Sequence, residues 1–202
     1  MKINDPDYWD LKFKEYKERG ISRIDLPGFD LIAGKIKEGD TVLDFGCGTG
    51  DFLKHISNIP GIRLYGCDIS RFAALDALKK LPDLAWYDNI TIFNDYFDVI
   101  TCIHVLEHFE DPVKCITDLK KALKPDGWLI VVLPFHDRYW LEHHKIWGKI
   151  EVEELFSHFD CDVETMVRNS TELGKHGKIF IKQYRDGALF EEVICFVKFH
   201  NP

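Results

Sequence analysis

Apolar residues recur along the chain in two patterns, as short unbroken runs and at wider spacings of three and four residues. The unbroken runs are typical of buried strands, and the wider spacings are typical of amphipathic helices. The runs predict strands over 41–45, 62–67, 84–87, 97–103, 128–133, 161–167 and 191–199. The helical spacings predict helices between Pro6 and Gly20, from Pro27 to Glu38, between Gly50 and Pro60, over 71–81, from Pro112 to Leu123 and over 152–159.

The order of these elements predicts the fold. Helices alternate with strands over most of the chain, as in a parallel sheet covered by helices. Residues 97–103 (FDVITCI) form one continuous apolar run, which is expected of a central strand buried on both faces. Two strands then finish the chain as an antiparallel pair. We therefore expect an α/β, doubly wound (Rossmann-like), mostly parallel sheet of about seven strands, with an antiparallel C-terminal strand and helices on both faces.

Composition narrows the class of protein. Of 202 residues, 46% are hydrophobic and 30% are charged, which suits a single globular domain. The formal net charge is −8 and no basic stripe occurs, so no nucleic-acid partner is expected. Every apolar run is shorter than the roughly 20 residues that span a membrane. No secretory signal pattern opens the chain. We expect a cytoplasmic protein without a membrane span, whose six cysteines are free thiols, mostly buried.

A glycine-rich segment follows the first predicted strand, at residues 42–50 (VLDFGCGTG). Its glycines let the backbone approach a ligand, and the next helix begins with N–H groups that can bind it. A dinucleotide site needs G-x-G-x-x-G, but Asp51 stands where the third glycine would be. The alternative to a ligand site is a tight turn between a strand and a helix.

A second acid, Asp68, ends the next predicted strand, 18 residues after Gly50. A carboxylate at this place can accept hydrogen bonds from two ribose hydroxyls. Taken alone, Asp68 is equally suited to cap the helix that begins near Ser70. Its register with the glycine-rich loop favours ribose binding.

Together these segments resemble class I methyltransferases that use S-adenosylmethionine (SAM). An acid two residues before G-x-G-x-G, here Asp44, resembles the first motif of that family. Residues 97–112 are similar to its F-D-V…V-L-E-H…D-P block, found in small-molecule methyltransferases such as the ubiquinone-pathway O-methyltransferases. Residues 119–134 resemble its next helix, turn and strand. The resemblance covers roughly residues 40–135 and implies SAM as cofactor and S-adenosylhomocysteine as product.

The resemblance also implies which residues bind the cofactor. Asp44 would support the loop and the methionine amino group, the glycines would wrap the methionyl portion, and Asp68 would bind ribose. Asp88 or Asn89 would meet the adenine edge, although an ordinary turn is the alternative there. The residues expected at the cofactor are Asp44, Gly46, Cys47, Gly48, Gly50, Asp68, Ile69, Asp88, Asn89, Ile103 and His104.

One position departs from the ubiquinone-pathway pattern. A Glu-x-x-Glu-His group is associated there with a divalent metal, but this chain has His104 in place of the first acid, followed by Glu107 and His108. Two imidazoles and a carboxylate can still hold a metal. The same motif also occurs where it only shapes the loop, and we therefore expect no obligatory metal.

The acceptor leaves a weaker signal, because the reactive methyl group belongs to the cofactor. We divide the single domain (1–202) into an N-terminal helical lid (1–38), a cofactor-binding half (39–135) and an acceptor-side half (136–202). The lid helix carries Tyr8, Trp9, Phe13 and Tyr16, and its alternative is an amphipathic helix packed on the sheet.

The connection after residue 135 is long, aromatic and rich in histidine, and we expect an acceptor pocket there. Its alternative is a surface loop pinned by buried aromatic residues. Within it, His143 or His144 is predicted to serve as general base, since an imidazole titrates near neutrality. The alternative is that both histidines pack or cap the following helix.

Three functions are compatible with the sequence. The first is transfer of a methyl group from SAM to an oxygen or nitrogen atom of a small-molecule acceptor, with a protein acceptor as a variant. The second is a catalytically silent, SAM-binding regulatory protein. The third, a nucleotide-dependent oxidoreductase, is disfavoured by the glycine spacing. The sequence does not indicate an oligomeric state.

Overall fold

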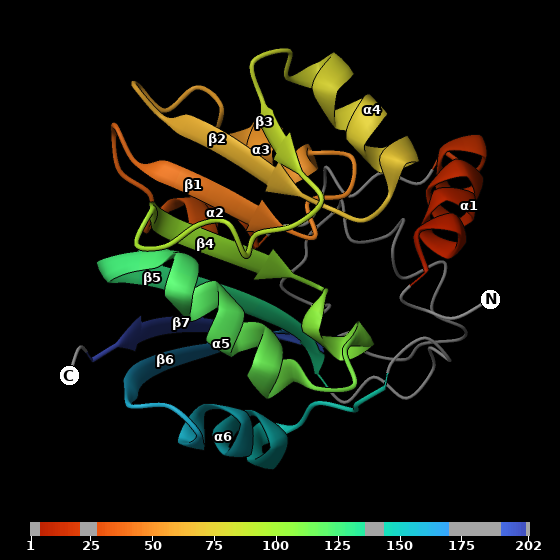
Figure 1. The fold of residues 1–202 in the computed structure, drawn as a ribbon. Helices are drawn as coiled ribbons and strands as arrows, with labels where there is room; N and C mark the ends of the chain where they lie inside the picture. Colours follow the sequence, from red (N-terminus) through yellow and green to blue (C-terminus); the bar gives the residue numbers. More distant parts are fainter. Residues whose placement is uncertain (1–4, 21–27, 136–143, 170–190, 201–202) are drawn as a thin grey trace.

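The computed structural model of the chain describes residues 5–20, 28–135, 144–169 and 191–200. A seven-stranded sheet lies at its centre, in the strand order β3-β2-β1-β4-β5-β7-β6 (Figure 1). The strands are β1 (Thr41–Phe45), β2 (Arg63–Cys67), β3 (Ala85–Tyr87), β4 (Phe97–Ile103), β5 (Leu123–Phe135), β6 (Cys161–Asn169) and β7 (Glu191–Phe199). The helices are α1 (Pro6–Glu18), α2 (Phe29–Ala33), α3 (Asp51–Ile56), α4 (Arg71–Lys80), the 3-10 helix η1 (Leu106–His108), α5 (Pro112–Ala122) and α6 (Lys149–Ser157).

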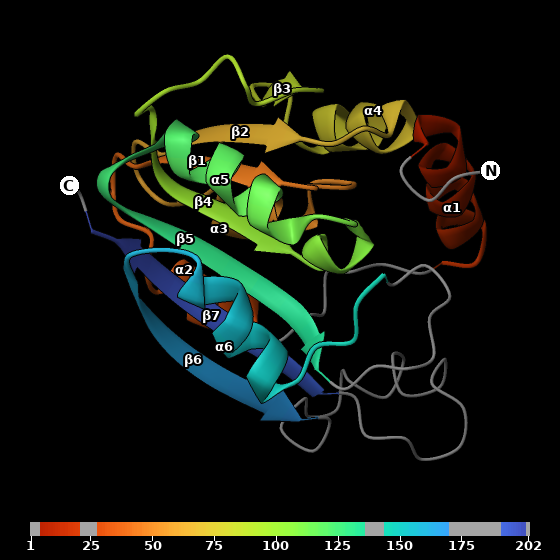
Figure 2. The ribbon, with the colours of Figure 1, turned by 60° about the horizontal axis from the view of Figure 1, so that its bottom comes forward.

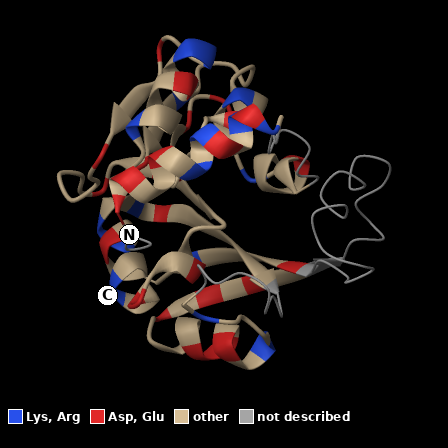
Figure 3. Cartoon of the chain, turned by 90° about the vertical axis from the view of Figure 1, so that its right-hand side faces the viewer, with Lys and Arg blue, Asp and Glu red and all other residues tan. Residues whose placement is uncertain are grey.

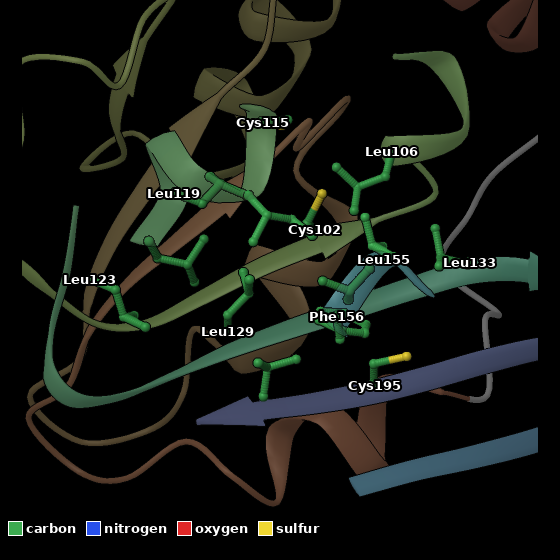
Figure 4. Close-up of a cluster of buried hydrophobic side chains, with 14 of the residues drawn as sticks. Cys102, Leu106, Cys115, Leu119, Leu123, Leu129, Leu133, Leu155, Phe156 and Cys195 are labelled. Carbon is green, nitrogen blue, oxygen red and sulfur yellow. The ribbon is translucent and has the colours of Figure 1, made fainter. Parts of the chain in front are cut away.

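The sheet confirms the predicted fold class. Strands β1 to β5 pair in parallel, and β7 is antiparallel to both of its neighbours, β5 and β6. Helices α5 and α6 cover one face, and α2 and α3 lie behind the sheet (Figure 2). Each face has its own apolar core. Leu119 and Leu129 pack in the first, with α5 and α6 (Figure 4), and Leu53 and Ile130 pack in the second, with α2, α3 and α4.

Two elements, α2 and β5, differ most from their predicted bounds. Helix α2 covers five residues, although the pattern predicts a helix of about twice that length over this region. Strand β5 begins at Leu123, five residues earlier than predicted, because Leu123 pairs with Phe97 before the expected turn. The register between β4 and β5 then shifts, and Asp126 has a φ of 64° within the shifted part. Regular pairing continues from Trp128, which lies opposite Val99.

The parallel strands determine where a ligand can bind. The strand order reverses between β1 and β4, so the loops after these two strands diverge to opposite faces of the sheet. In open α/β sheets a ligand crevice lies at such a point, beyond the carboxyl ends of the strands. Helix α1 lies at this edge of the sheet, next to α4 (Figures 1 and 2). No helix among the described residues is long and apolar enough to cross a membrane.

Candidate active site

The loop between β1 and α3 depends on its glycines. Gly46, Gly48 and Gly50 have φ values of 76°, 50° and 75°, in the left-handed region that glycine adopts without strain. A Cβ atom at Gly46 would collide with the side chain of Val105, and one at Gly48 would come within 3.1 Å of the Phe13 ring. Glycine is therefore required at these positions, because the loop packs closely against Val105 and Phe13.

Two buried acids lie beside this loop. The Asp44 carboxylate, at the end of β1, accepts a hydrogen bond from Thr101 Oγ1 (2.7 Å) on the neighbouring strand β4. Asp68 Oδ2 accepts a hydrogen bond from the backbone N–H of Gly48 (2.8 Å), and its Oδ1 accepts one from the N–H of Ser70 (2.8 Å). Asp68 therefore joins the glycine-rich loop to the start of α4.

A cavity of about 500 Å³ opens at this edge, which is in the size range of small-molecule sites. Six of the predicted cofactor residues line it: Gly46, Asp68, Ile69, Asp88, Asn89 and His104. The other five predicted residues are not among its lining: Asp44, Cys47, Gly48, Gly50 and Ile103.

Further lining residues come from α1 and from the segment after β4. Trp9 and Phe13 of α1 form one wall, and Val105, His108 and Phe109 form another. The rings of Trp9 and His108 meet edge to face at 4.8 Å, so α1 and η1 touch across the cavity. Helix α1 therefore closes one side of the cavity.

The cavity has an acidic character. Its lining includes the carboxylates of Asp68, Asp88, Glu110, Asp111 and Asp118, together with the ammonium group of Lys114. Lys114 Nζ lies 2.8 Å from Asp118 Oδ2 and neutralises that acid in part. The remaining charge favours a cationic ligand, such as one that carries a sulfonium or an ammonium group.

Two thiols at the cavity are unsuited to nucleophilic chemistry. Burial raises the pKa of the Cys67 and Cys115 thiols to about 12, so both stay protonated near neutral pH. All six cysteines are free, and all but Cys161 are buried, as the sequence predicts.

His104 occupies an unusual place at the end of β4, with a φ of 54°. Its Nε2 lies 3.3 Å from Glu192 Oε2 on β7, and its Nδ1 lies 3.5 Å from Glu107 Oε1 on η1. Burial alone would lower the pKa of the imidazole, but the hydrogen bonds and charges of Glu107 and Glu192 outweigh it and raise the pKa to about 9. Each ring nitrogen of His104 thus faces a carboxylate, an arrangement that favours the protonated imidazolium form.

Comparison with known proteins decides the family. A family model described as a methyltransferase domain matches residues 16–170. The ubiquinone biosynthesis O-methyltransferase of Hydrogenovibrio crunogenus is 33% identical over 100 residues, which cover 46% of this chain and 42% of that protein. This chain belongs to the class I SAM-dependent methyltransferase family.

Other relatives have different acceptors in their names. The tRNA U34 carboxymethyltransferase of Campylobacter hominis is 31% identical over 108 residues, or 50% of this chain and 38% of that protein. The match thus spans about two fifths of the length of these two curated relatives. The family is shown by the comparisons, but the acceptor is not.

Solved structures share the fold. The structure of a Haloferax volcanii putative methyltransferase in complex with the Trm112 methyltransferase activator matches with a TM-score of 0.72 and 20% identity, over 95% of this chain and 98% of that one. A SAM-dependent methyltransferase from Geobacter sulfurreducens, solved with S-adenosylhomocysteine, matches with a TM-score of 0.61 and 14% identity, over 85% of this chain and 90% of that one. Identities this low show the fold alone.

The acidic residues in the lining of the methyltransferase cavity suit a cationic ligand. Four further lining residues, Val105, His108, Phe109 and Glu110, follow His104. None of these four is among the predicted cofactor residues, although the V-L-E-H block marks this segment in the sequence.

The histidines predicted for catalysis are not in the described lining of the methyltransferase cavity. His143 lies outside the described residues. His144 is exposed, and its backbone N–H donates to the carbonyl oxygen of Glu107 (2.8 Å). A role of either histidine as general base stays a prediction, to be tested by Asn or Gln replacement once an acceptor is known.

Metal independence also stays a prediction. Over the ranges that the structure describes, no group of three or more His, Cys, Asp or Glu side chains is placed to hold a metal ion. We expect methyl transfer to continue in EDTA, because the imidazolium of His104 already faces Glu107 and Glu192. Loss of activity in EDTA that magnesium or zinc restores would contradict this.

Proposed function

We propose that this chain transfers the methyl group of SAM to an oxygen or nitrogen atom of a small-molecule acceptor. One observation carries the proposal: a single cavity is lined by Gly46 of the glycine-rich loop, Asp68 after β2, Asp88 and Asn89 after β3, and His104 after β4. These residues come from four successive strand ends, and the family resemblance assigns them to one cofactor.

The residues of the loop would bind the methionyl portion. Gly46 lets the backbone approach. Asp68 holds the loop through Gly48, and Asp44 joins the end of β1 to β4 through Thr101. Asp68 also faces the cavity, where its carboxylate can accept hydrogen bonds from ribose hydroxyls.

Residues after β2 and β3 would bind the nucleoside. Asp88 and Asn89 offer polar groups to the adenine edge, and Ile69 offers an apolar contact beside it. SAM supplies the reactive methyl group, so the protein has to position an acceptor in line with it and exclude water. The aromatic wall of Trp9, Phe13 and Phe109 suits that exclusion.

We also propose that the three segments predicted from the sequence act as a lid (1–38), a cofactor-binding half (39–135) and an acceptor-side half (136–202). The position of Trp9 and Phe13 in the cavity wall supports the first of these. The silent regulatory alternative is not favoured, since the relatives that match are named as methyltransferases.

A tRNA acceptor is the second candidate, because the Campylobacter hominis relative has one in its name. Two observations favour a small molecule. The cavity is acidic, which opposes a phosphate backbone, and acidic and basic positions are interspersed over the edge of the sheet that carries α1 (Figure 3).

A transfer assay distinguishes these acceptors. The protein is incubated with SAM that carries a labelled methyl group, together with either a cell extract filtered to contain only small molecules or purified tRNA. We expect label in the small-molecule fraction and production of S-adenosylhomocysteine. Label in tRNA alone would contradict the small-molecule proposal.

A further inference from the structure

Helix α1 is fastened to the start of α4 by one carboxylate. Asp10 Oδ1 accepts a hydrogen bond from Ser70 Oγ (2.6 Å) and another from the backbone N–H of Phe72 (3.0 Å). Ser70 is the N-cap of α4, and its Oγ in turn accepts from the N–H of Ala73 (3.1 Å). The N–H of Phe72 lies in the first turn of α4, where backbone N–H groups have no acceptor within the helix. Asp10 of α1 supplies that acceptor, in addition to the N-cap Ser70.

The same serine contacts the acid proposed to bind ribose. The backbone N–H of Ser70 donates to Asp68 Oδ1, while the N–H of Gly48 donates to Asp68 Oδ2, both at 2.8 Å. Ser70 is fully buried, so both of its contacts are shielded from water. A continuous series of hydrogen bonds thus runs from Gly48 through Asp68 and Ser70 to Asp10.

Helix α1 also reaches the cavity directly. The Phe13 ring packs against Gly48, and Trp9 meets His108 on the opposite wall. A second tether, between Lys17 Nζ and Asp76 Oδ1 (2.7 Å), joins α1 to α4 one turn or more beyond Ser70. Docking of α1 on α4 therefore places an aromatic wall over the glycine-rich loop.

We propose that Asp10 is a positioning residue for the cofactor, which docks α1 on α4 and, through Ser70, orients the carboxylate of Asp68. This inference rests on the proposed function, since it places SAM in the cavity that α1 closes. Because coupling between two equilibria is reciprocal, bound cofactor must stabilise docked α1 as much as docked α1 strengthens cofactor binding. Asp10 itself touches neither the cavity nor, by this account, the cofactor.

Four single variants, and the double variant that combines Asp10→Ala with Ser70→Ala, test the coupling. Asp10→Ala removes both hydrogen bonds, Asp10→Asn keeps an acceptor oxygen, and Ser70→Ala removes the hydroxyl but keeps the N–H that faces Asp68. Glu15→Ala is the matched control, because Glu15 is an exposed acid of the same helix that pairs with Arg19 within α1 (2.9 Å). Two quantities are measured for each: the affinity for S-adenosylhomocysteine by calorimetry, and hydrogen exchange of residues 6–18 with and without that ligand.

We expect Asp10→Ala to weaken the affinity for S-adenosylhomocysteine about tenfold. This is the loss expected if the replacement leaves α1 docked in only about a tenth of the molecules, because the apparent affinity falls with the fraction of molecules that can bind. Ser70→Ala should have a similar effect, and the double variant should lose little more, since both changes break the hydrogen bond between Asp10 and Ser70. Asp10→Asn should restore most of the affinity, and Glu15→Ala should bind as the wild type does. The ligand should slow exchange of residues 6–18 in the wild type and the control, and much less in Asp10→Ala.

The outcomes separate this inference from the proposed function. If the wild type binds S-adenosylhomocysteine and Asp10→Ala and Ser70→Ala bind it equally well, the coupling is wrong and the proposed function stands. If the wild type does not bind it, both are wrong. Exchange of the β1 and β4 amides shows whether each variant is folded, and a general loss of protection in Asp10→Asn, which keeps the acceptor, would also overturn the inference.

Discussion

Replacing His104 with asparagine should lower the free energy of unfolding at pH 7 by about 3–5 kcal/mol. The change removes the cation that faces Glu107 and Glu192, two side chains that are 1% and 3% exposed. Removal of one member of a buried ion pair is costly because it leaves the other charges in a medium that solvates them poorly. Asparagine is the appropriate replacement, because among uncharged residues other than glycine it tolerates the φ of 54° at this position well.

The same pairing predicts how stability depends on pH. The pKa of His104 in the folded chain is raised to about 9, above the value of about 6.5 for an unperturbed imidazole. The stabilisation is therefore fully present below about pH 6.5 and is lost as the pH rises through about 9, a change of about 3 kcal/mol. Urea unfolding between pH 6.5 and 9.5 should show this decline in the wild type and not in His104→Asn.

His200 provides a matched control. Its ring nitrogens also face two carboxylates, Asp160 (2.8 Å) and Asp162 (3.1 Å), but its side chain is 47% exposed. His200→Asn should therefore change the unfolding free energy at pH 7 much less than His104→Asn does. Equal effects of the two replacements at pH 7 would show that the burial of the His104 cluster has no energetic consequence.

Replacing Asp68 with alanine should weaken binding of S-adenosylhomocysteine by roughly 10- to 100-fold. Loss of hydrogen bonds to a charged acceptor costs about 1.5–3 kcal/mol, and each 1.4 kcal/mol is about tenfold in affinity. The structure adds a second consequence, since Asp68 also accepts hydrogen bonds from Gly48 and Ser70. The variant should remain folded but melt at a lower temperature than the wild type.

A modified ligand separates the two roles of Asp68. A derivative of S-adenosylhomocysteine without the ribose hydroxyls is titrated into the wild type and into Asp68→Ala. If Asp68 binds these hydroxyls, the replacement should weaken binding of the natural ligand much more than binding of the derivative. An equal loss for both ligands would show that Asp68 acts only by holding the loop.

The sequence predicts those parts of the fold that are determined by residues close together in the sequence, and not those that depend on contacts between distant segments. Strands β1, β4 and β7 have the predicted bounds, because unbroken or alternating apolar residues reflect burial directly. The start of β5 was not predictable in this way. Its first residue, Leu123, also continues the apolar pattern of α5, and only its pairing with Phe97 makes it part of a strand.

The site shows the same limit. Gly46 and Asp68 are predicted by motifs, since a loop and a strand end carry a local signature. The ion pair of His104 with Glu192 joins residues 88 positions apart, and no local pattern marks it. The contact of Asp10 with Ser70, 60 positions apart, likewise depends on the packing of α1 on α4.

The most direct test of the central claim is a calorimetric titration of the wild-type chain with S-adenosylhomocysteine and, separately, with NAD. The account predicts saturable binding of S-adenosylhomocysteine and no comparable heat from NAD, because Asp51 stands where a dinucleotide loop needs its third glycine. The Asp68→Ala variant should lose most of that affinity in the same experiment. Tight binding of NAD, with no response to S-adenosylhomocysteine, would contradict the assignment of this cavity to SAM.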